Sequence, residues 1–164
     1  MNRQRPMTKE DDVRETPPEL FTSRVAKWGG FDLDAAATPA NAKARRFFTE
    51  QDNGLVQLWS GRVWINPPFS EMGAWTAKCW AEVAAGRVEL IDFLSPATRT
   101  EQPWWQKLVE PYRDGRAVLV PGWRLDTDFL PKRPRFLKDG VAMGSPKFGC
   151  VMLTWRPVNV SRDR

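Results

Sequence analysis

The sequence predicts an α/β fold, with one domain built on a mainly parallel sheet. Hydrophobic residues make up 41% of the 164 residues, and 9 Trp and 9 Phe can fill one core. Short apolar runs alternate with segments of helical periodicity, and strands joined through helices pair in parallel by right-handed crossovers. The last two apolar runs have no helix between them, so we expect an antiparallel strand at the edge of the sheet.

The first helix is expected within T-P-P-E-L-F-T-S-R-V-A-K-W-G-G, residues 16–30. Thr16 stands where an N-cap would, and Pro17 suits the first helical position. Glu19 lies three residues after Thr16 and completes a capping box. Gly29 is expected to end the helix.

The strands are expected at short apolar runs bounded by turn-forming residues. These runs are F-D-L-D-A-A-A (31–37), R-V-W-I (62–65), R-V-E-L-I-D-F-L (87–94), A-V-L-V-P (117–121) and K-F-G-C-V-M-L-T-W (147–155). A second helix is expected over 71–85 with Ser70 as its cap, and a third over 101–110. Residues 38–61 are expected to be mostly loop with some helix, and D-N-G at 52–54 to form a turn.

Three regions are expected along the chain. Residues 1–15 are polar and dense in charge, which predicts a flexible N-terminal arm. Residues 16–158 form the folded domain, and residues 159–164 form a short tail. No apolar run reaches the about 18 residues of a membrane span, and the first residues lack the apolar stretch of a signal peptide. We therefore expect a cytoplasmic protein.

Composition limits the chemistry. The net charge of +5 favours an anionic partner such as nucleic acid. Histidine is absent, and the two cysteines, Cys79 and Cys150, are too few and too far apart for a zinc cluster. The sequence therefore argues against acid/base catalysis by histidine, and we expect no metal site.

The stretch R-V-W-I-N-P-P-F-S, residues 62–70, carries the most specific chemistry. Asn66 follows the end of a predicted strand, where ligands bind in open α/β sheets. Pro67 and Pro68 stiffen the backbone and have no N–H, so nearby carbonyls are free to accept hydrogen bonds from a ligand. Phe69 adds a flat apolar surface. This combination suits a planar ring that bears an exocyclic amine.

The N-P-P-F motif resembles the signature Asp/Asn/Ser-Pro-Pro-Tyr/Phe/Trp of the amino-methyltransferases. Together with T-P-P-E-L-F and G-F-D-L-D-A-A-A, it is similar to the phage-type DNA N6-adenine methyltransferase family over about residues 11–95. The resemblance implies a single-domain Rossmann-like fold that uses S-adenosylmethionine as methyl donor. It also implies site-specific methylation of adenine N6 in duplex DNA, with the target base rotated out of the helix. A phage protein would act in the cytoplasm of a bacterial host.

The resemblance implies a set of site residues. The catalytic loop would consist of Asn66, Pro67, Pro68 and Phe69. The methyl donor would contact Thr16, Pro17, Asp32, Asp34, Ala35 and Ala36. The two aspartates supply acceptors for ammonium and ribose hydroxyl groups, and the two alanines permit close approach of the backbone. The substrate would contact Asp52 and, through its phosphates, the basic residues Lys132, Arg133 and Arg135.

Alternatives stay open at this point. Thr16 with Pro17 makes a complete helix start without a ligand, Asp32 suits a surface ion pair, and Asp52 suits a turn. Cytosine N4, RNA adenine and a protein glutamine also present a planar amine to such a loop. A catalytically inactive relative that binds nucleic acid is a further alternative.

Overall fold

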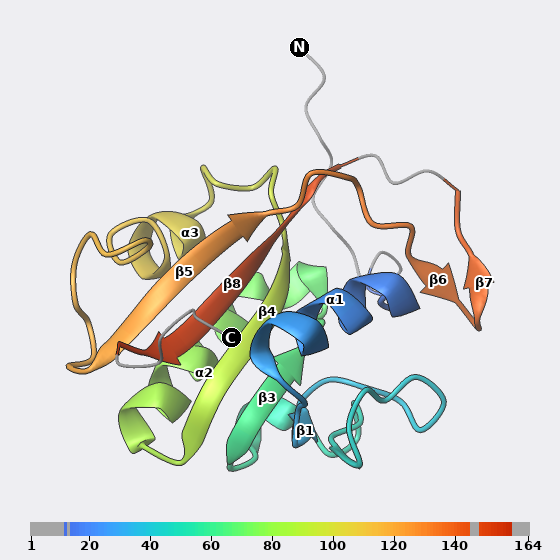
Figure 1. The fold of residues 1–164 in the computed structure, drawn as a ribbon, viewed down its shortest axis with the longest axis horizontal. Coiled ribbons are helices and arrows are strands. Elements are labelled where there is room, and N and C mark those ends of the chain that lie inside the picture. The colour runs from blue at the N-terminus through green and yellow to red at the C-terminus, as the bar shows by residue number, and fades with distance from the viewer. Residues whose placement is uncertain (1–11, 13, 145–147, 159–164) are drawn as a thin grey trace.

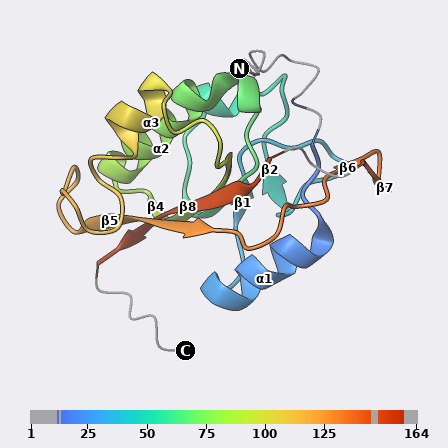
Figure 2. The ribbon, with the colours of Figure 1, turned by 90° about the horizontal axis from the view of Figure 1, so that it is seen from above.

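The protein is described from a computed structural model, which describes residue 12, residues 14–144 and residues 148–158. A central sheet separates α1 (Pro18–Trp28) on one face from α2 (Met72–Ala85) and α3 (Pro103–Leu108) on the other (Figures 1 and 2). The predicted α/β class is confirmed. No helix in the described part of the chain is long and apolar enough to cross a membrane.

The sheet has six strands in the order β2-β1-β3-β4-β8-β5. Their bounds are β1 (Leu33–Asp34), β2 (Arg46–Phe47), β3 (Gly61–Ile65), β4 (Val88–Pro96), β5 (Trp123–Phe129) and β8 (Cys150–Pro157). The first four strands in this order are parallel, and β8 is antiparallel to both β4 and β5. One antiparallel strand was expected at the edge, but β8 lies one place inside it. A separate hairpin pairs β6 (Leu137–Lys138) with β7 (Val141–Ala142).

The helices form where the sequence predicts them, but their first turns differ. Pro17 occupies the N-cap position of α1 and no side chain caps this helix, so the expected cap at Thr16 is wrong. The second helix begins at Met72 after a short 3-10 turn (Phe69–Glu71), so Ser70 is not its cap either. Instead, Ser70 donates from its backbone N and its Oγ to the carboxylate of Asp12 at 2.9 and 2.6 Å.

The strand expected at 117–121 does not form, and Val118 in its middle is 69% exposed. The reason lies in the preceding turn, which occupies the position beside β5. Asp114 donates its N–H to the carbonyl of Leu125 at 2.8 Å, and its carboxylate accepts from the N–H of Thr127 at 2.8 Å. Residues 117–121 are thereby left outside the sheet as an exposed loop.

The region 38–61 is mostly loop, as expected, although it also contributes the short strand β2. The D-N-G turn is confirmed, because Asn53 adopts a left-handed conformation with φ 54° before the 3-10 turn Gly54–Val56. The predicted arm over residues 1–15 lies mostly outside the described residues. Its described members Asp12, Arg14 and Glu15 contact the folded domain. The predicted tail over 159–164 is likewise outside the described part.

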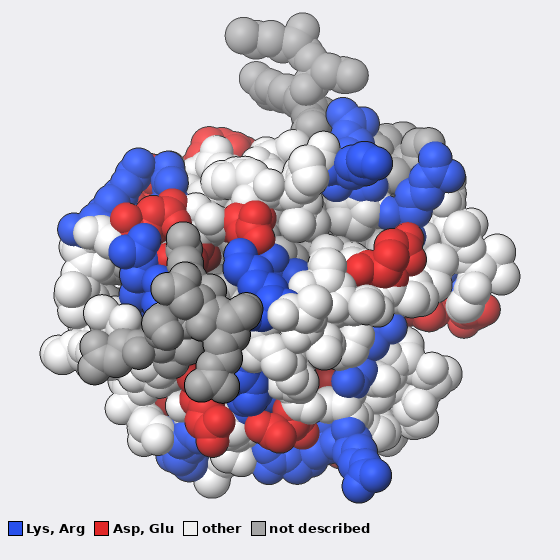
Figure 3. Space-filling view, in the orientation of Figure 1, with Lys and Arg blue, Asp and Glu red and all other residues white. Residues whose placement is uncertain are grey.

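Charged side chains of both signs are interspersed over the face seen in Figure 1. Figure 3 shows Lys and Arg side chains gathered over the segment that joins β5 to β6, at the upper right of the view. Lys132, Arg133 and Arg135 of this segment are exposed, whereas Pro134 and Phe136 are buried. The alternation indicates an extended chain whose basic side chains face solvent.

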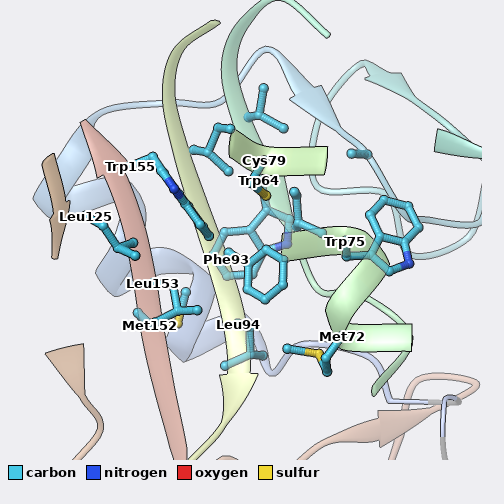
Figure 4. Packing of buried hydrophobic residues seen from close by; sticks show 14 of the residues in the cluster. Trp64, Met72, Trp75, Cys79, Phe93, Leu94, Leu125, Met152, Leu153 and Trp155 are labelled. Atoms are coloured by element: carbon cyan, nitrogen blue, oxygen red, sulfur yellow. The ribbon is translucent and has the colours of Figure 1, made fainter. Parts of the chain in front are cut away.

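The hydrophobic core fills both faces of the sheet (Figure 4). On the α2 face, the ring of Trp155 packs edge-on against Trp80 at 5.8 Å and lies 5.7 Å from Phe93. On the α1 face, Trp64 packs edge-on against Phe21 at 5.1 Å. Tryptophans therefore serve as core residues on both sides of β3 and β4.

A buried ion pair fixes α1 to the sheet. Arg24 of α1 donates Nε and Nη2 to the two carboxylate oxygens of Asp92 in β4, at 2.7 and 3.0 Å. The side chains are 4% and 0% exposed. Arg24 also pairs with Asp128 of β5 at 2.7 Å, and Thr154 of β8 donates to Asp92 at 2.8 Å. One helix residue thus connects to three strands.

Replacement of Asp92 by Ala should lower the free energy of unfolding by about 3–5 kcal/mol, because Arg24 would keep its buried charge without its main partner. Urea unfolding measures this. Lys27→Ala is the matched control, since Lys27 pairs with Asp128 at the surface with 41% of its side chain exposed. Its loss should cost less than about 1 kcal/mol. Equal losses in the two variants would contradict a special role for the buried pair.

Candidate active site

The site lies where the order of the strands reverses. From β1 the chain goes to β2 on one side and then returns to β3 on the other side of β1. The register pairs Leu33 with Val63 and Asp34 with Trp64, so both parallel strands end at the same edge. Ligands of open α/β sheets bind in the crevice at such a point. Asp34 ends β1, and Asn66 follows directly after β3.

The side chain of Asn66 is held in one orientation. Its Nδ2 donates to the carbonyl oxygen of Arg14 at 2.5 Å and to Oγ1 of Thr16 at 3.1 Å. A carboxamide nitrogen has two N–H groups, so both are engaged. Among the described residues, no group donates to Oδ1. Asn66 therefore presents an acceptor and has no spare donor.

The two prolines add to this acceptor character. Pro67 is buried and Pro68 is partly buried, and neither has an N–H. Within the described residues, no backbone N–H donates to the carbonyls of Asn66 or Pro67, whereas the carbonyl of Pro68 accepts from Glu71 at 3.0 Å. Three oxygens of the motif are thus available to a ligand that donates hydrogen bonds.

Phe69 is covered in this structure, although the sequence predicted an open surface for stacking. Its ring is 5% exposed and lies 6.1 Å from Phe136 and 6.0 Å from Phe148. The guanidinium carbon of Arg14 lies 5.8 Å from the ring centre of Phe69 and 5.0 Å from that of Phe148. These neighbours have no local signal in the sequence, because the three phenylalanines lie far apart in the chain.

The K-R-P-R segment borders this aromatic cluster. Phe136, which packs edge-on against Phe69, follows Arg135 directly. The exposed side chains of Lys132, Arg133 and Arg135 therefore lie on the chain that covers the N-P-P-F loop. The structure brings these predicted phosphate contacts to the rim of the site.

Asp34 combines burial with unused acceptor capacity. It is 3% exposed, and its two oxygens accept from the N–H groups of Ala36 at 3.3 Å and Lys43 at 2.9 Å. Burial raises the pKa of Asp34 to about 7, and these two hydrogen bonds only partly oppose the rise. Two of the about four lone-pair positions of the carboxylate are therefore used within the chain. A cationic or hydroxylic ligand group would stabilise its charged form.

The turn at Asn53 and Gly54 packs on the end of β1. A Cβ at Gly54 would lie 2.2 Å from the carbonyl oxygen of Ala35, so only glycine allows this approach. Asp52 holds the turn, because its carboxylate accepts from both N and Oγ1 of Thr49 at 2.9 Å. The hydrogen bond from the Thr49 N–H lowers the pKa of Asp52. The structure thus gives Asp52 the role of a turn former next to the segment that packs on the end of β1.

The remaining predicted residues separate into two groups. Thr16 and Pro17 are buried beside the N-P-P-F loop, and Ala35 and Ala36 follow directly after β1. Asp32 instead precedes β1, on the side of the sheet where the amino ends of the parallel strands lie. Its exposed carboxylate accepts from the N–H of Arg62 at 2.8 Å. The structure does not bring Asp32 to the other predicted donor contacts.

Comparison with known proteins agrees with this architecture. The profile of the family described as DNA N-6-adenine-methyltransferase (Dam) matches residues 4–118. A protein of Escherichia phage T1 named DNA N-6-adenine-methyltransferase is 32% identical over 88 residues, which is 52% of this chain and 36% of that protein. A protein of the same name from Haemophilus phage HP1 is 46% identical over 41 residues, 24% of each chain. The matches span about a third and a quarter of these relatives.

A mainly parallel sheet with acceptor groups at the ends of two adjacent strands, together with the family match, is consistent with a Rossmann-like methyltransferase fold. The chain belongs to the DNA N-6-adenine-methyltransferase (Dam) family, whose profile covers more than half of it. The family expected from the sequence is therefore confirmed.

Asp34 should make the stability of the protein depend on pH. Its pKa is about 7 in the folded chain and about 3.9 in an unfolded one, so the folded state holds the proton more tightly. The contribution of the Asp34 carboxyl group to the free energy of unfolding is fully present below about pH 4 and is lost as the pH rises to about 7. Relative to the wild type, Asp34→Asn should gain about 1.4 kcal/mol per pH unit over this range, whatever constant cost the amide adds.

Urea unfolding at several pH values measures this difference. The reference is the wild-type protein measured over the same pH series. If the curve of Asp34→Asn runs parallel to that of the wild type, the carboxyl group of Asp34 does not hold the buried proton described above.

Proposed function

We propose that this chain transfers a methyl group from S-adenosylmethionine to the N6 amine of adenine in DNA. The observation that carries the proposal is the orientation of Asn66, whose Nδ2 is engaged and whose Oδ1 is left to accept. An exocyclic amine offers two N–H donors and a poorly nucleophilic nitrogen. A site made of acceptors suits an exocyclic amine, which donates hydrogen bonds. It offers no hydrogen bond to a ring that carries a carbonyl oxygen at the same position.

The residues at the end of β1 fit the methyl donor. Asp34 is a buried carboxylate with free acceptor positions, and the raised pKa of its carboxyl group, caused by burial, marks a site that a cation would stabilise. Ala35 and Ala36 present backbone groups without large side chains. Thr16 and Pro17 complete the border toward the N-P-P-F loop. When bound, S-adenosylmethionine supplies a methyl group attached to a positively charged sulfur.

The N-P-P-F loop would hold the amine for attack. Oδ1 of Asn66 and the carbonyl of Pro67 would each accept one hydrogen of the amine, which would keep the nitrogen lone pair directed toward the methyl group. As the new carbon–nitrogen bond forms, the carbon–sulfur bond would break and leave a neutral thioether, and the methylated amine would then release one proton to solvent. Alignment of this kind can lower the activation barrier of a reaction by about 7–11 kcal/mol. The chain needs no histidine for this task, which agrees with its composition.

Phe69 would form one wall of the pocket for the rotated base. Its ring is covered by Arg14, Phe136 and Phe148, so the base can reach it only if part of this cover moves. Stacking of a base on an aromatic side chain is worth about 1–3 kcal/mol. Lys132, Arg133 and Arg135 at the rim would contact DNA phosphates.

Nucleoside mass spectrometry after incubation with unmethylated DNA and S-adenosylmethionine tests the proposal. The expected product is N6-methyladenine in DNA. N4-methylcytosine in the DNA would identify a different planar amine as the target, and parallel incubations with RNA and with a glutamine-containing protein test the other two amines. A wild-type protein that binds DNA and transfers no methyl group would overturn the proposed activity.

Asn66→Ala should lower the turnover number by about two to three powers of ten, as removal of other single polar catalytic groups does. Affinity for the methyl donor should stay close to the wild-type value, because the acceptor acts on the target amine. Methyl transfer, donor binding by calorimetry and thermal melting are measured together, so that unfolding is recognised. Full activity in this variant would sink the assignment of Asn66.

Replacement of Lys132 and Arg135 by Ala should reduce the dependence of DNA binding on salt. The slope of log K against log salt should fall by up to about 0.9 for each phosphate contact that is lost. Arg46→Ala with Arg87→Ala is a charge-matched control. Both arginines are exposed and lie where β2 and β4 begin, at the opposite edge of the sheet. Equal slopes in the two double variants would show that only total charge matters.

A further inference from the structure

The segment that leads into α1 fixes the orientation of the Asn66 side chain. The carbonyl oxygen of Arg14 lies 2.5 Å and Oγ1 of Thr16 lies 3.1 Å from Nδ2. The reverse orientation would place Oδ1 against the Arg14 carbonyl, where two acceptor oxygens would repel each other. The observed orientation is thus set from outside the N-P-P-F motif, by residues about fifty positions earlier in the chain.

We propose that Thr16 is a positioning residue for methyl transfer, which acts by holding the Asn66 carboxamide with Oδ1 directed to the target amine. The inference rests on the proposed function of Asn66. Thr16 is 3% exposed and does not cap α1, so its hydroxyl is not needed to start the helix. Its hydrogen bond from Asn66 is a contact that a plain helix start does not require.

The segment is itself held in place on both sides. Glu15, between the two acceptors, pairs with Leu137 through two backbone hydrogen bonds of 2.8 and 3.0 Å. Asp12 accepts from N and Oγ of Ser70, the residue that follows N-P-P-F. The acceptors of Arg14 and Thr16 are therefore fixed relative to the loop. Groups held by such contacts can keep a catalytic side chain in place before the substrate arrives.

The hydrogen bonds from Asn66 to Arg14 and Thr16 also limit the role of the Asn66 side chain. With both of its N–H groups engaged, the Asn66 side chain can only accept hydrogen bonds. If the carboxamide were rotated by 180°, it would point its N–H donors at the target amine, which is itself a donor. Loss of Thr16 leaves one N–H of a partly buried amide without its partner and removes one of two restraints on rotation. Arg14 still holds the other N–H. The expected loss of activity is therefore smaller than that of Asn66→Ala.

Thr16→Val tests the proposal, because valine keeps the shape of the side chain and lacks the acceptor. The turnover number should fall about three- to tenfold, the range expected for loss of one hydrogen bond. The KM for DNA and the melting temperature should change little, and any change in affinity for the methyl donor, whose proposed site Thr16 borders, should be smaller than the fall in turnover. Thr16→Ser, which restores the hydroxyl, should recover most of the turnover.

The matched control is Thr76→Val. Thr76 is a fully buried threonine of α2 whose hydroxyl donates to the carbonyl of Met72 at 2.7 Å. This variant should alter the melting temperature at least as much as Thr16→Val and leave the turnover number unchanged. If both variants lower turnover equally, loss of a buried hydroxyl has a general effect and the positioning role is overturned.

A double-mutant cycle separates positioning from a role of Thr16 in the donor site or in stability. In the Asn66→Ala background, Thr16→Val should cause no further loss of turnover, because its target is gone. In contrast, a further loss of the full size would overturn the inference. A side-chain readout checks the same point without catalysis: the Asn66 amide protons, identified by their absence in Asn66→Ala, should exchange with water faster in Thr16→Val.

The outcomes distinguish this inference from the proposed function. If wild-type protein methylates adenine and Asn66→Ala is impaired, but Thr16→Val equals the wild type in turnover, only the positioning role is overturned. If Asn66→Ala is fully active, both the assignment of Asn66 and the inference fail. Impaired turnover in Thr16→Val, recovery in Thr16→Ser and no additional loss in the double variant support the positioning role.

Discussion

Parallel pairing of β1 with β3 determines where this protein can carry out chemistry. Because the two strands run side by side in the same direction, Asp34 and Asn66 arrive at the same edge of the sheet. The long connection between them must turn back over the end of β1. Gly54 allows this, since any side chain there would meet the carbonyl of Ala35. The proximity of the buried carboxylate to the acceptor loop follows from one register of two short strands.

Two buried aspartates show how the sheet separates structure from function. Asp92 in the middle of β4 is fully buried and is matched by Arg24 and Thr154. Asp34 at the end of β1 is also buried, but among the described residues it receives only two backbone hydrogen bonds and no guanidinium group. Its pKa rises because burial outweighs these two hydrogen bonds and the charge of Lys43. A buried carboxylate that the fold compensates only in part is suited to a ligand, whereas a fully matched one holds the fold together.

Local patterns predicted the parts of the fold that depend on local chemistry. The strand before N-P-P-F, the helix after it and the aspartate at the end of β1 all have a clear period or position in the sequence. The prediction of a strand at 117–121 was wrong because an apolar run indicates hydrophobicity but does not show which segment pairs with the neighbouring strand. The true strand, β5, contains polar residues such as Asp126, whose partner Arg156 lies on β8. Such nonlocal pairing leaves no periodic signal.

The prediction that Thr16 caps the first helix was also wrong, and in this case the sequence contains the reason. Pro17 is followed by Pro18, and a residue before proline is driven out of the helical conformation. Pro17 accordingly has φ −60° and ψ 138°, so the helix begins at Pro18 and Thr16 stands two places before it. A hydroxyl at that distance cannot cap the helix, and it accepts from Asn66 instead. Asn66 itself precedes Pro67 and is subject to the same restriction. Each proline pair disfavours the helical conformation in the residue before it, so Thr16 stays outside α1 and within hydrogen-bonding distance of Asn66, on which the proposed chemistry depends.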